Sequence, residues 1–213
     1  MQNGTLPYAH NRDALLKNTR DLVSASRANN IPVIYSQHAN LPFKWMDQET
    51  RTMLQHMGKD EHFGWMQAGT QEWEIIPDLK PDPDDLVLSV HTPSFFAGTP
   101  LESILRRDGI HTIVITGFAT HSGILVTARQ GVLLGFNMVV VEDAVGAVTI
   151  DHHEKALKLL RQGCDVLPTA EVLPRLKHNS LEHILPPPLL GWRDAESSDD
   201  GRRDRHERRR YDR

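Results

Sequence analysis

Thiols are almost absent from this chain of 213 residues, because Cys164 is its only cysteine. A single cysteine excludes an internal disulfide. Cys164 lies in the segment QGCDVL at residues 162–167, which is typical of a late strand. The thiol is either a catalytic group or a small hydrophobic side chain in the core, and its place in a strand favours the second interpretation.

Long apolar runs are absent as well. None approaches the roughly 18 residues that a membrane-spanning helix needs, and the polar first residues do not resemble a signal peptide. We therefore expect a cytoplasmic protein that makes no contact with membranes. Hydrophobic residues still make up 39% of the chain, which is enough to bury one core of ordinary size.

Apolar residues become scarce near the end of the chain, after the three prolines at residues 186–188. Residues 201–213 carry seven arginines and three acidic side chains. Such a segment cannot bury enough surface to offset the entropy lost on ordering. We predict one folded domain over residues 1–185 and a disordered tail over residues 186–213. Nucleic-acid binding by this tail is not expected, because arginine and acid alternate and no aromatic platform accompanies them.

Helical and strand patterns alternate through the body of the chain. This alternation indicates an α/β fold in which a mostly parallel, doubly wound sheet lies between two layers of helices. Asn29, Asn30, Gly109, Gly135 and Gly163 provide signals for helix ends. We expect helices at residues 11–29, 100–107, 120–134, 151–161 and 169–176, and strands at residues 32–37, 86–90, 112–116, 138–141 and 162–167.

The segment TGFATHSG at residues 116–123 follows the β-branched run TIVI and starts a helical pattern. A tight turn from strand to helix directs backbone N–H groups and the positive end of the helix dipole to one point, which suits an anion or an oxyanion. Parallel sheets bind ligands at the carboxyl ends of their strands, where Gln37, His38 and His91 are also expected. We therefore predict one site formed by these side chains and by the turn residues Phe118, Ala119, Thr120, His121, Ser122 and Gly123.

The turn resembles the TG-x-A-T-x-x-C motif of the isochorismatase-like hydrolases, a superfamily that includes nicotinamidases and other cysteine amidohydrolases. The segment VHTPSFFAGTPL at residues 90–101 is similar to the K-x-x-x-S-x-F-x-G-T-x-L segment of this family, and MQNG at residues 1–4 is similar to the end of its first strand. The resemblance implies a three-layer α-β-α fold, a cis peptide between Phe118 and Ala119, and action on a small molecule without a cofactor.

Three positions depart from the family's set of aspartate, lysine and cysteine. Gly123 stands at the cysteine position, His91 stands at the lysine position, and the chain begins one residue after the place of the aspartate. The family's first strand lies in the middle of the sheet, so we expect Met1 to be an internal methionine of a longer reading frame. True isochorismatases cleave a vinyl ether without a thiol, and their A-H-x-G turn is similar to this chain at Gly123.

His91 has two interpretations. An imidazole loses its proton near pH ~6.5 and can therefore act as a general acid or base, whereas a lysine would supply a fixed positive charge. His91 is alternatively a histidine with a structural role at the end of a strand. Ser122 beside His121 suggests a hydroxyl nucleophile with a base, but neighbouring helical side chains point in different directions and no acid is placed to orient His121. A serine hydrolase is therefore not expected.

Metal binding is not expected, although the chain contains twelve histidines. The stretch Ser36-Gln37-His38 is similar to the D-x-H metal motif of nicotinamidases but lacks its carboxylate. The pairs His152–His153 and His56/His62 do not have the i, i+4 spacing that places two imidazoles on one helical face. Glu142 and Asp143 are expected to end a strand, where a carboxylate that caps the next turn is favoured over an acid–base pair.

Aromatic residues form only 6% of the chain, yet several gather with methionines between residues 43 and 73. The resemblance implies that this region forms a lid over the pocket and part of a subunit contact, so we expect a homo-oligomer. Ordinary core packing remains the alternative. Trp65 and Phe96 are predicted to line the pocket with Gln37 and His38. The cluster consists of Phe43, Trp45, Met46, Met53, Met57, Phe63, Trp65, Met66 and Trp73.

Two functions remain open on these grounds. The first is a hydrolase of the isochorismatase-like kind that cleaves an amide, an imide or a vinyl ether in a small molecule without a thiol nucleophile. The second is a catalytically silent relative that keeps the pocket and the oligomer as a ligand-binding or scaffolding unit.

Overall fold

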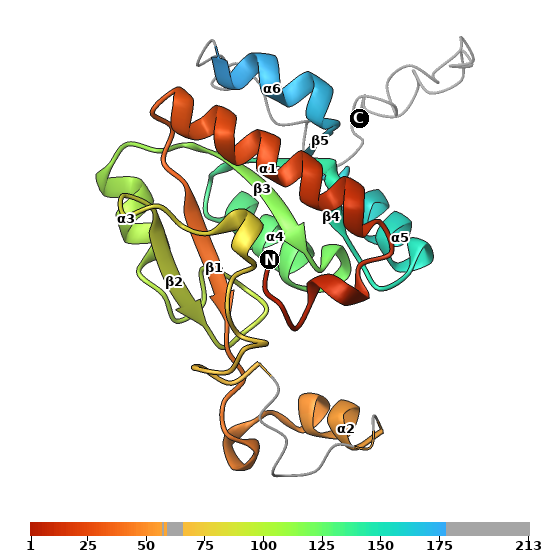
Figure 1. The fold of residues 1–213 in the computed structure, drawn as a ribbon. Coiled ribbons are helices and arrows are strands. Elements are labelled where there is room, and N and C mark those ends of the chain that lie inside the picture. Colours follow the sequence, from red (N-terminus) through yellow and green to blue (C-terminus); the bar gives the residue numbers. More distant parts are fainter. Residues whose placement is uncertain (57, 59–65, 178–213) are drawn as a thin grey trace, which may run out of the picture.

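The computed structural model describes residues 1–56, 58 and 66–177, in which helices and strands alternate along the chain (Figure 1). The strands are β1 (Ile34–His38), β2 (Leu86–Val90), β3 (Thr112–Phe118), β4 (Asn137–Gly146) and β5 (Asp165–Leu167). The α-helices are α1 (Arg12–Ala28), α2 (Gln48–His56), α3 (Leu101–Arg107), α4 (Leu125–Leu133), α5 (Ile150–Leu160) and α6 (Thr169–Lys177).

The helices end where the sequence predicted. Gly109 follows α3 with φ 67°, Gly135 follows α4 with φ 86°, and Asn30 follows α1 with φ 55°. These positive φ values are adopted readily by glycine and, among other residues, most often by asparagine. Local backbone chemistry therefore fixes these helix ends.

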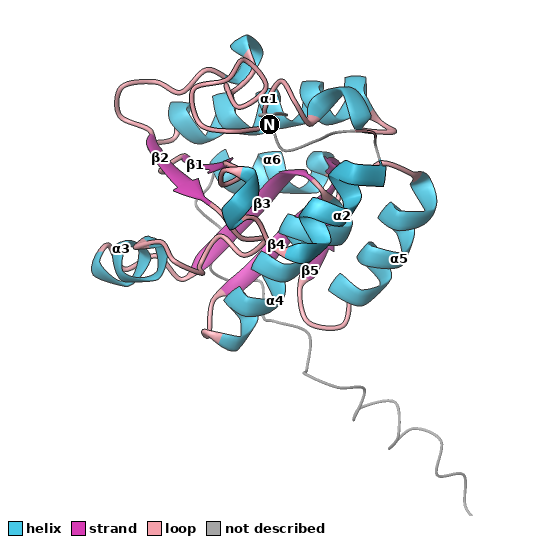
Figure 2. Ribbon diagram, turned by 90° about the horizontal axis from the view of Figure 1, so that it is seen from below, coloured by secondary structure: helices cyan, strands magenta, loops and turns pink. Residues whose placement is uncertain are grey.

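The central strand β4 shows why the fold has three layers. Val139 and Val141 pack with side chains of α1 and α6, whereas Met138 and Val140 pack with α3, α4 and α5 on the opposite face. Side chains of a strand alternate between faces, so an uninterrupted apolar run needs helices on both sides. Figure 2 shows the strands between these two helical layers. The α/β fold with parallel strands is thereby confirmed.

Two local expectations are corrected. The helix expected from residue 120 begins as a π-helical turn, Thr120–Ile124, before α4 starts at Leu125. Strand β4 does not end at Glu142 and Asp143 but continues to Gly146. These carboxylates are accommodated by partners distant in sequence: Glu142 pairs with Arg161 at 2.5 Å, and Asp143 accepts hydrogen bonds from both the backbone N–H and the hydroxyl of Thr169, each at 2.7 Å.

The strands form two parallel sheets rather than one. Strand β1 pairs with β2, and β3, β4 and β5 form a second sheet in the order β3-β4-β5. Within the described ranges, no strand pairs with the other edge of β1 or of β3. Ile113, Val114 and Ile115 of β3 are only partly buried, while the equivalent apolar run of β4 is fully buried. The sheet is therefore interrupted between β1 and β3.

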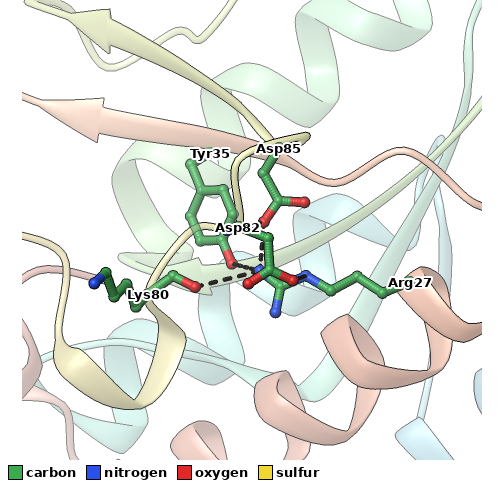
Figure 3. A network of polar contacts seen from close by, with 5 residues as sticks. All are labelled: Arg27, Tyr35, Lys80, Asp82 and Asp85. Atoms are coloured by element: carbon green, nitrogen blue, oxygen red, sulfur yellow. Dashed lines mark hydrogen bonds and ion pairs between the residues drawn. The ribbon is translucent and has the colours of Figure 1, made fainter.

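An ion-pair cluster around Arg27 connects the smaller sheet to helix α1 (Figure 3). The guanidinium pairs with Asp85 and, at 3.1 Å, with Asp82, both in the loop that leads into β2. It also donates to the hydroxyl of Tyr35 at 3.2 Å and to the carbonyl of Lys80 at 3.3 Å. Burial raises the pKa of the Tyr35 phenol, which stays uncharged at neutral pH. Arg27 thus joins α1 to both strands of the small sheet.

We expect Arg27→Ala to lower the free energy of unfolding by about 3 kcal/mol, because it leaves a buried carboxylate without its partner. The Asp85 side chain is 6% exposed. A loss of this size lowers the midpoint of thermal unfolding by about 6–12 °C. The matched control is Arg20→Ala, because the Arg20–Asp78 pair is half exposed and should contribute about 1 kcal/mol or less. Equal effects of the two substitutions in thermal unfolding would contradict the prediction.

No helix within the described ranges is long and apolar enough to cross a membrane. The predicted tail at residues 186–213, and residues 178–185 before it, lie outside the described residues.

Candidate active site

The turn at residues 118–123 connects β3 to the π-helical segment Thr120–Ile124. The Phe118–Ala119 peptide is cis, as the resemblance implied. The Ala119 carbonyl accepts the N–H groups of Ser122 at 3.1 Å and of Ile124 at 3.2 Å. Those two amides are therefore occupied within the turn. Only the other amides of the turn are therefore candidates to donate hydrogen bonds to an anion.

His91 follows the last residue of β2 and is exposed. Its Nδ1 atom lies 2.7 Å from the carbonyl oxygen of Ala39. A carbonyl oxygen only accepts hydrogen bonds, so Nδ1 carries a proton and Nε2 is the nitrogen that can gain or lose one. Within the described part of the chain, Nε2 makes no hydrogen bond. The fixed ring thus presents one reactive nitrogen at the strand end.

His38 ends β1 directly opposite Val90 in the parallel register, which brings it next to His91. Its Nε2 atom lies 3.1 Å from the Oδ1 atom of Asn40. Burial is the largest cause of a lowered pKa for His38; the contact with Asn40 acts in the opposite direction, and the charge of His91 lowers the pKa further. His38 is therefore uncharged at neutral pH.

The segment after β2 lies against the turn after β3. A side chain at Gly123 would place its Cβ atom 3.6 Å from the Pro93 carbonyl oxygen, which is an ordinary contact distance. Nearby, the Phe95 N–H donates to the hydroxyl of Thr127 in α4 at 3.0 Å. The structure thus brings Pro93, in the segment that starts at His91, next to the turn that contains Gly123.

The predicted pocket residues have different environments. Gln37 is 8% exposed, and its amide donates to the Trp73 carbonyl at 3.1 Å. Phe96 is 7% exposed and stacks on Phe136 with ring centroids 5.7 Å apart. This packing assigns Phe96 to the core between the sheet and its helices rather than to the pocket wall. Trp65 lies outside the described residues.

Gln2 contributes to the site in a way that the sequence did not predict. Its amide donates to the His38 carbonyl at 2.8 Å and accepts from the His38 N–H at 3.0 Å. It also donates to the Trp73 carbonyl at 2.5 Å. The side chain therefore pairs with both backbone groups of His38 on the edge of β1 that lacks a strand. Only the resemblance of MQNG to the family's first strand drew attention to this position; Asn40 carried no signal.

His121 and Ser122 do not form a nucleophile–base pair. The ring of His121 stacks on His152 with centroids 4.8 Å apart, and its buried Nδ1 atom has no hydrogen-bond partner within the described residues. Because nothing in this part of the chain orients the imidazole toward Ser122, the arrangement lacks the geometry that activates a serine.

Among the described residues, no group of three or more histidine, cysteine or acidic side chains is close enough to hold a metal ion.

Met46 and Met66 are buried, whereas Trp45 is 68% and Met53 42% exposed. The aromatic and methionine cluster is thus divided between core and surface. Met57, Phe63 and Trp65 of that cluster lie outside the described residues.

Cys164 lies in the core next to β5 and is 3% exposed. Burial raises the pKa of its thiol to about 11. At pH 8 the reactive thiolate is then about 200-fold less populated than in a free cysteine, whose pKa is about 8.5. We expect iodoacetamide to modify the folded protein at least about 100-fold more slowly than the unfolded chain, as measured by mass spectrometry.

Alkylation of Cys164 also bears on catalysis. Any hydrolytic activity should survive modification that leaves the fold intact, because the thiol lies just before β5 and not in the turn. Loss of activity in parallel with labelling, at unchanged circular dichroism, would show instead that this cysteine performs the chemistry.

Known proteins share the sequence and the fold just described. The family model named isochorismatase domain matches residues 1–171. The secreted isochorismatase effector Isc1 of Verticillium dahliae is 41% identical over 78 residues, which are 37% of this chain and 41% of that protein. The ureidoacrylate amidohydrolase RutB of an Enterobacter species is 30% identical over 156 residues, 67% of this chain and 66% of that protein.

A solved structure, an isochorismatase family protein of Desulfovibrio vulgaris, superposes with a TM-score of 0.71 at 25% identity and covers 83% of this chain and 94% of its own. The chain thus spans less than two thirds of the two sequence relatives, about two fifths in the fungal protein. Its likeness to the solved structure extends over nearly the whole of that chain.

Proposed function

Because the chain belongs to the isochorismatase family, we propose that it is a small-molecule hydrolase that cleaves its substrate without a thiol nucleophile. The observation that carries the proposal is the convergence of the His91 segment with the turn around Gly123, since a Cβ atom at Gly123 would contact the Pro93 carbonyl at 3.6 Å. The only cysteine, Cys164, is buried elsewhere with a raised pKa.

The site supplies the imidazole of His91 and several backbone amide dipoles of the turn. The Nε2 atom of His91 faces away from the Ala39 carbonyl that holds Nδ1, so a protonated ring can stabilise negative charge that develops on the substrate. The N–H groups of Ser122 and Ile124 already donate to the Ala119 carbonyl. The other amides of the 118–123 turn would add to this stabilisation. If a strand that ends in aspartate is joined to Met1, its carboxyl group would act as the general acid.

The preferred substrate class is a vinyl ether, with amides and imides as the alternatives. An amide cleaved by covalent catalysis needs a nucleophile at the turn, and Gly123 provides none. Vinyl-ether cleavage begins instead with proton transfer from an acid to carbon, which leaves a positive oxocarbenium ion that water captures to form a hemiketal. The hemiketal then collapses to a carbonyl compound and an alcohol, and the negative charge that develops on the departing oxygen is the charge that His91 and the turn would stabilise. The name of the fungal relative, a secreted isochorismatase effector, agrees with this preference, whereas the name of the Enterobacter relative specifies an amide.

The second candidate function is a silent relative that binds a ligand or forms a scaffold. The interrupted sheet and the glycine at the thiol position favour it. Incubation with isochorismate, ureidoacrylate and nicotinamide, followed by product analysis, separates the two functions. Turnover of any of them supports the hydrolase. A rise in unfolding temperature with ligand but without product supports the silent relative, because a ligand that binds only the folded state stabilises it.

The proposal extends to assembly and location. Trp45 is 68% exposed and Leu133 is 86% exposed. Exposed apolar side chains are common in subunit contacts, so we expect a homo-oligomer. We also expect the protein to act in the cytoplasm and to bind a small molecule. Light scattering after gel filtration measures the mass in solution, and a monomer would contradict the oligomer.

A further inference from the structure

Four histidine rings form two close pairs beside the turn at residues 118–123. His10 and His153 have ring centroids 5.0 Å apart, and His121 and His152 have centroids 4.8 Å apart. The rings belong to three separate parts of the chain, since residue 10 precedes α1, residue 121 lies in the turn, and residues 152 and 153 lie in the first turn of α5. The proposed reaction uses none of them.

His153 contacts the turn directly. Its Nδ1 atom lies 3.0 Å from the hydroxyl oxygen of Thr120, the first residue of the π-helical segment. Thr120 is completely buried and His153 is 8% exposed, so the contact is shielded from water. Thr120 adjoins Ala119, whose carbonyl holds the turn together. The imidazole therefore contacts the residue that is bonded directly to Ala119, the residue whose carbonyl sets the turn's shape.

His10 supports His153 from the other side. The backbone N–H of His10 donates to the Ala147 carbonyl at 2.9 Å, and its ring Nδ1 lies 2.9 Å from the same oxygen. Ala147 follows the end of β4. The pair of rings thus links the segment before α1, the end of β4, the start of α5 and the turn.

We propose that His153, supported by His10, is a positioning residue that holds the 118–123 turn in its working shape while the His153 ring is neutral and releases it when that ring gains a proton. The link to activity rests on the proposed function, in which amides of this turn stabilise negative charge. The contacts themselves do not depend on any substrate.

The surroundings of His153 favour its neutral form. Burial is the largest cause of its lowered pKa, His10 and Arg161 lower it further, and Glu154 acts in the opposite direction. Burial and then His152 lower the pKa of His121 as well. The folded state therefore holds fewer protons than the unfolded chain. The stabilisation is complete above the unfolded value of ~6.5 and is lost as the pH falls through the lower folded values.

Hydrogen exchange read by mass spectrometry tests this without any substrate. Peptides that cover residues 118–125 are compared with peptides from α1 at about pH 7.5 and about pH 5, after correction for the intrinsic exchange rate. Two positive rings 5.0 Å apart repel enough, even at the dielectric constant of water, to shift an equilibrium about fourfold. We expect the protection of the turn to fall at the lower pH by at least this factor relative to α1.

His153→Gln keeps a group that can bond to Thr120 but cannot be charged. The loss of protection on acidification should disappear in this variant and persist in the control His111→Gln, which removes an exposed histidine outside the cluster. Should H153Q fail to fold by circular dichroism, His10→Gln takes its place, since it removes the repulsion and leaves the Thr120 contact. A turn whose relative protection does not change with pH, or a loss that persists in the folded variant, overturns the proposal. Absence of hydrolysis would not affect this result.

Discussion

Fusing an apolar strand of about six residues that ends in aspartate to Met1 should raise the free energy of unfolding by about 3 kcal/mol and the unfolding midpoint by about 6–12 °C. Among the residues that the structure describes, no strand lies between β1 and β3, so each of the two has an edge without a paired strand. A strand inserted there gains backbone hydrogen bonds on both sides and further buries the partly buried side chains of Ile113, Val114 and Ile115.

The position of Met1 makes the insertion feasible. Met1 packs in the cluster that also contacts Phe118 at the end of β3, and the neighbouring Gln2 pairs with His38 at the end of β1. An added strand that precedes Met1 would thus have its carboxyl end between the carboxyl ends of β1 and β3. Burial also lowers the pKa of the Met1 amino group to about 6, and a peptide bond at that place removes the burial of an ionisable group.

A matched control carries proline at the third and fifth positions of the added strand. Proline has no N–H and cannot continue a ladder, so this extension has the same length but should give less than about 1 kcal/mol. Thermal unfolding supplies the comparison, and hydrogen exchange at β1 and β3 locates the effect. If both extensions leave exchange at these strands unchanged, the two edges do not accept a strand.

The sequence predicted those parts of the fold that local chemistry decides. The TIVI run and the following TGFATHSG predicted the strand β3 and the tight turn after it, although the strand is only partly buried, and Gly109 and Gly135 supplied helix ends that need positive φ. The rule that parallel strands end at one edge led to the prediction that His91 lies near the turn, and the structure places Pro93 of the same segment beside Gly123.

The features that the sequence did not predict depend on partners far away in the chain. Strand β4 continues past Asp143 because Thr169 satisfies that carboxylate from the start of α6. Gln2 completes the backbone pairing of His38 through its side chain, which no periodic pattern announces. The pairing of His10 with His153 joins segments at opposite ends of the domain.

His91→Ala should lower turnover of the preferred substrate about 10²-fold or more in the chain that carries the aspartate-ending strand. The substitution removes an exposed imidazole and leaves space for water to bond to the Ala39 carbonyl that the ring held. Stability should therefore change little. The fall in kcat then reports lost charge stabilisation rather than unfolding.

The pH dependence of the same protein separates a protonated His91 from a structural one. If the ring must carry a proton, activity falls as the pH rises through the range in which an imidazole loses it, whereas a lysine stays charged to about pH 10. His91→Lys should consequently move the fall to higher pH while retaining turnover. A strand that ends in asparagine instead of aspartate is the control for the general acid and should abolish activity at every pH. If the extended protein converts none of the three test compounds, and His91→Ala leaves ligand-induced thermal shifts and oligomeric state unchanged, His91 has a structural role and the silent relative replaces the enzyme.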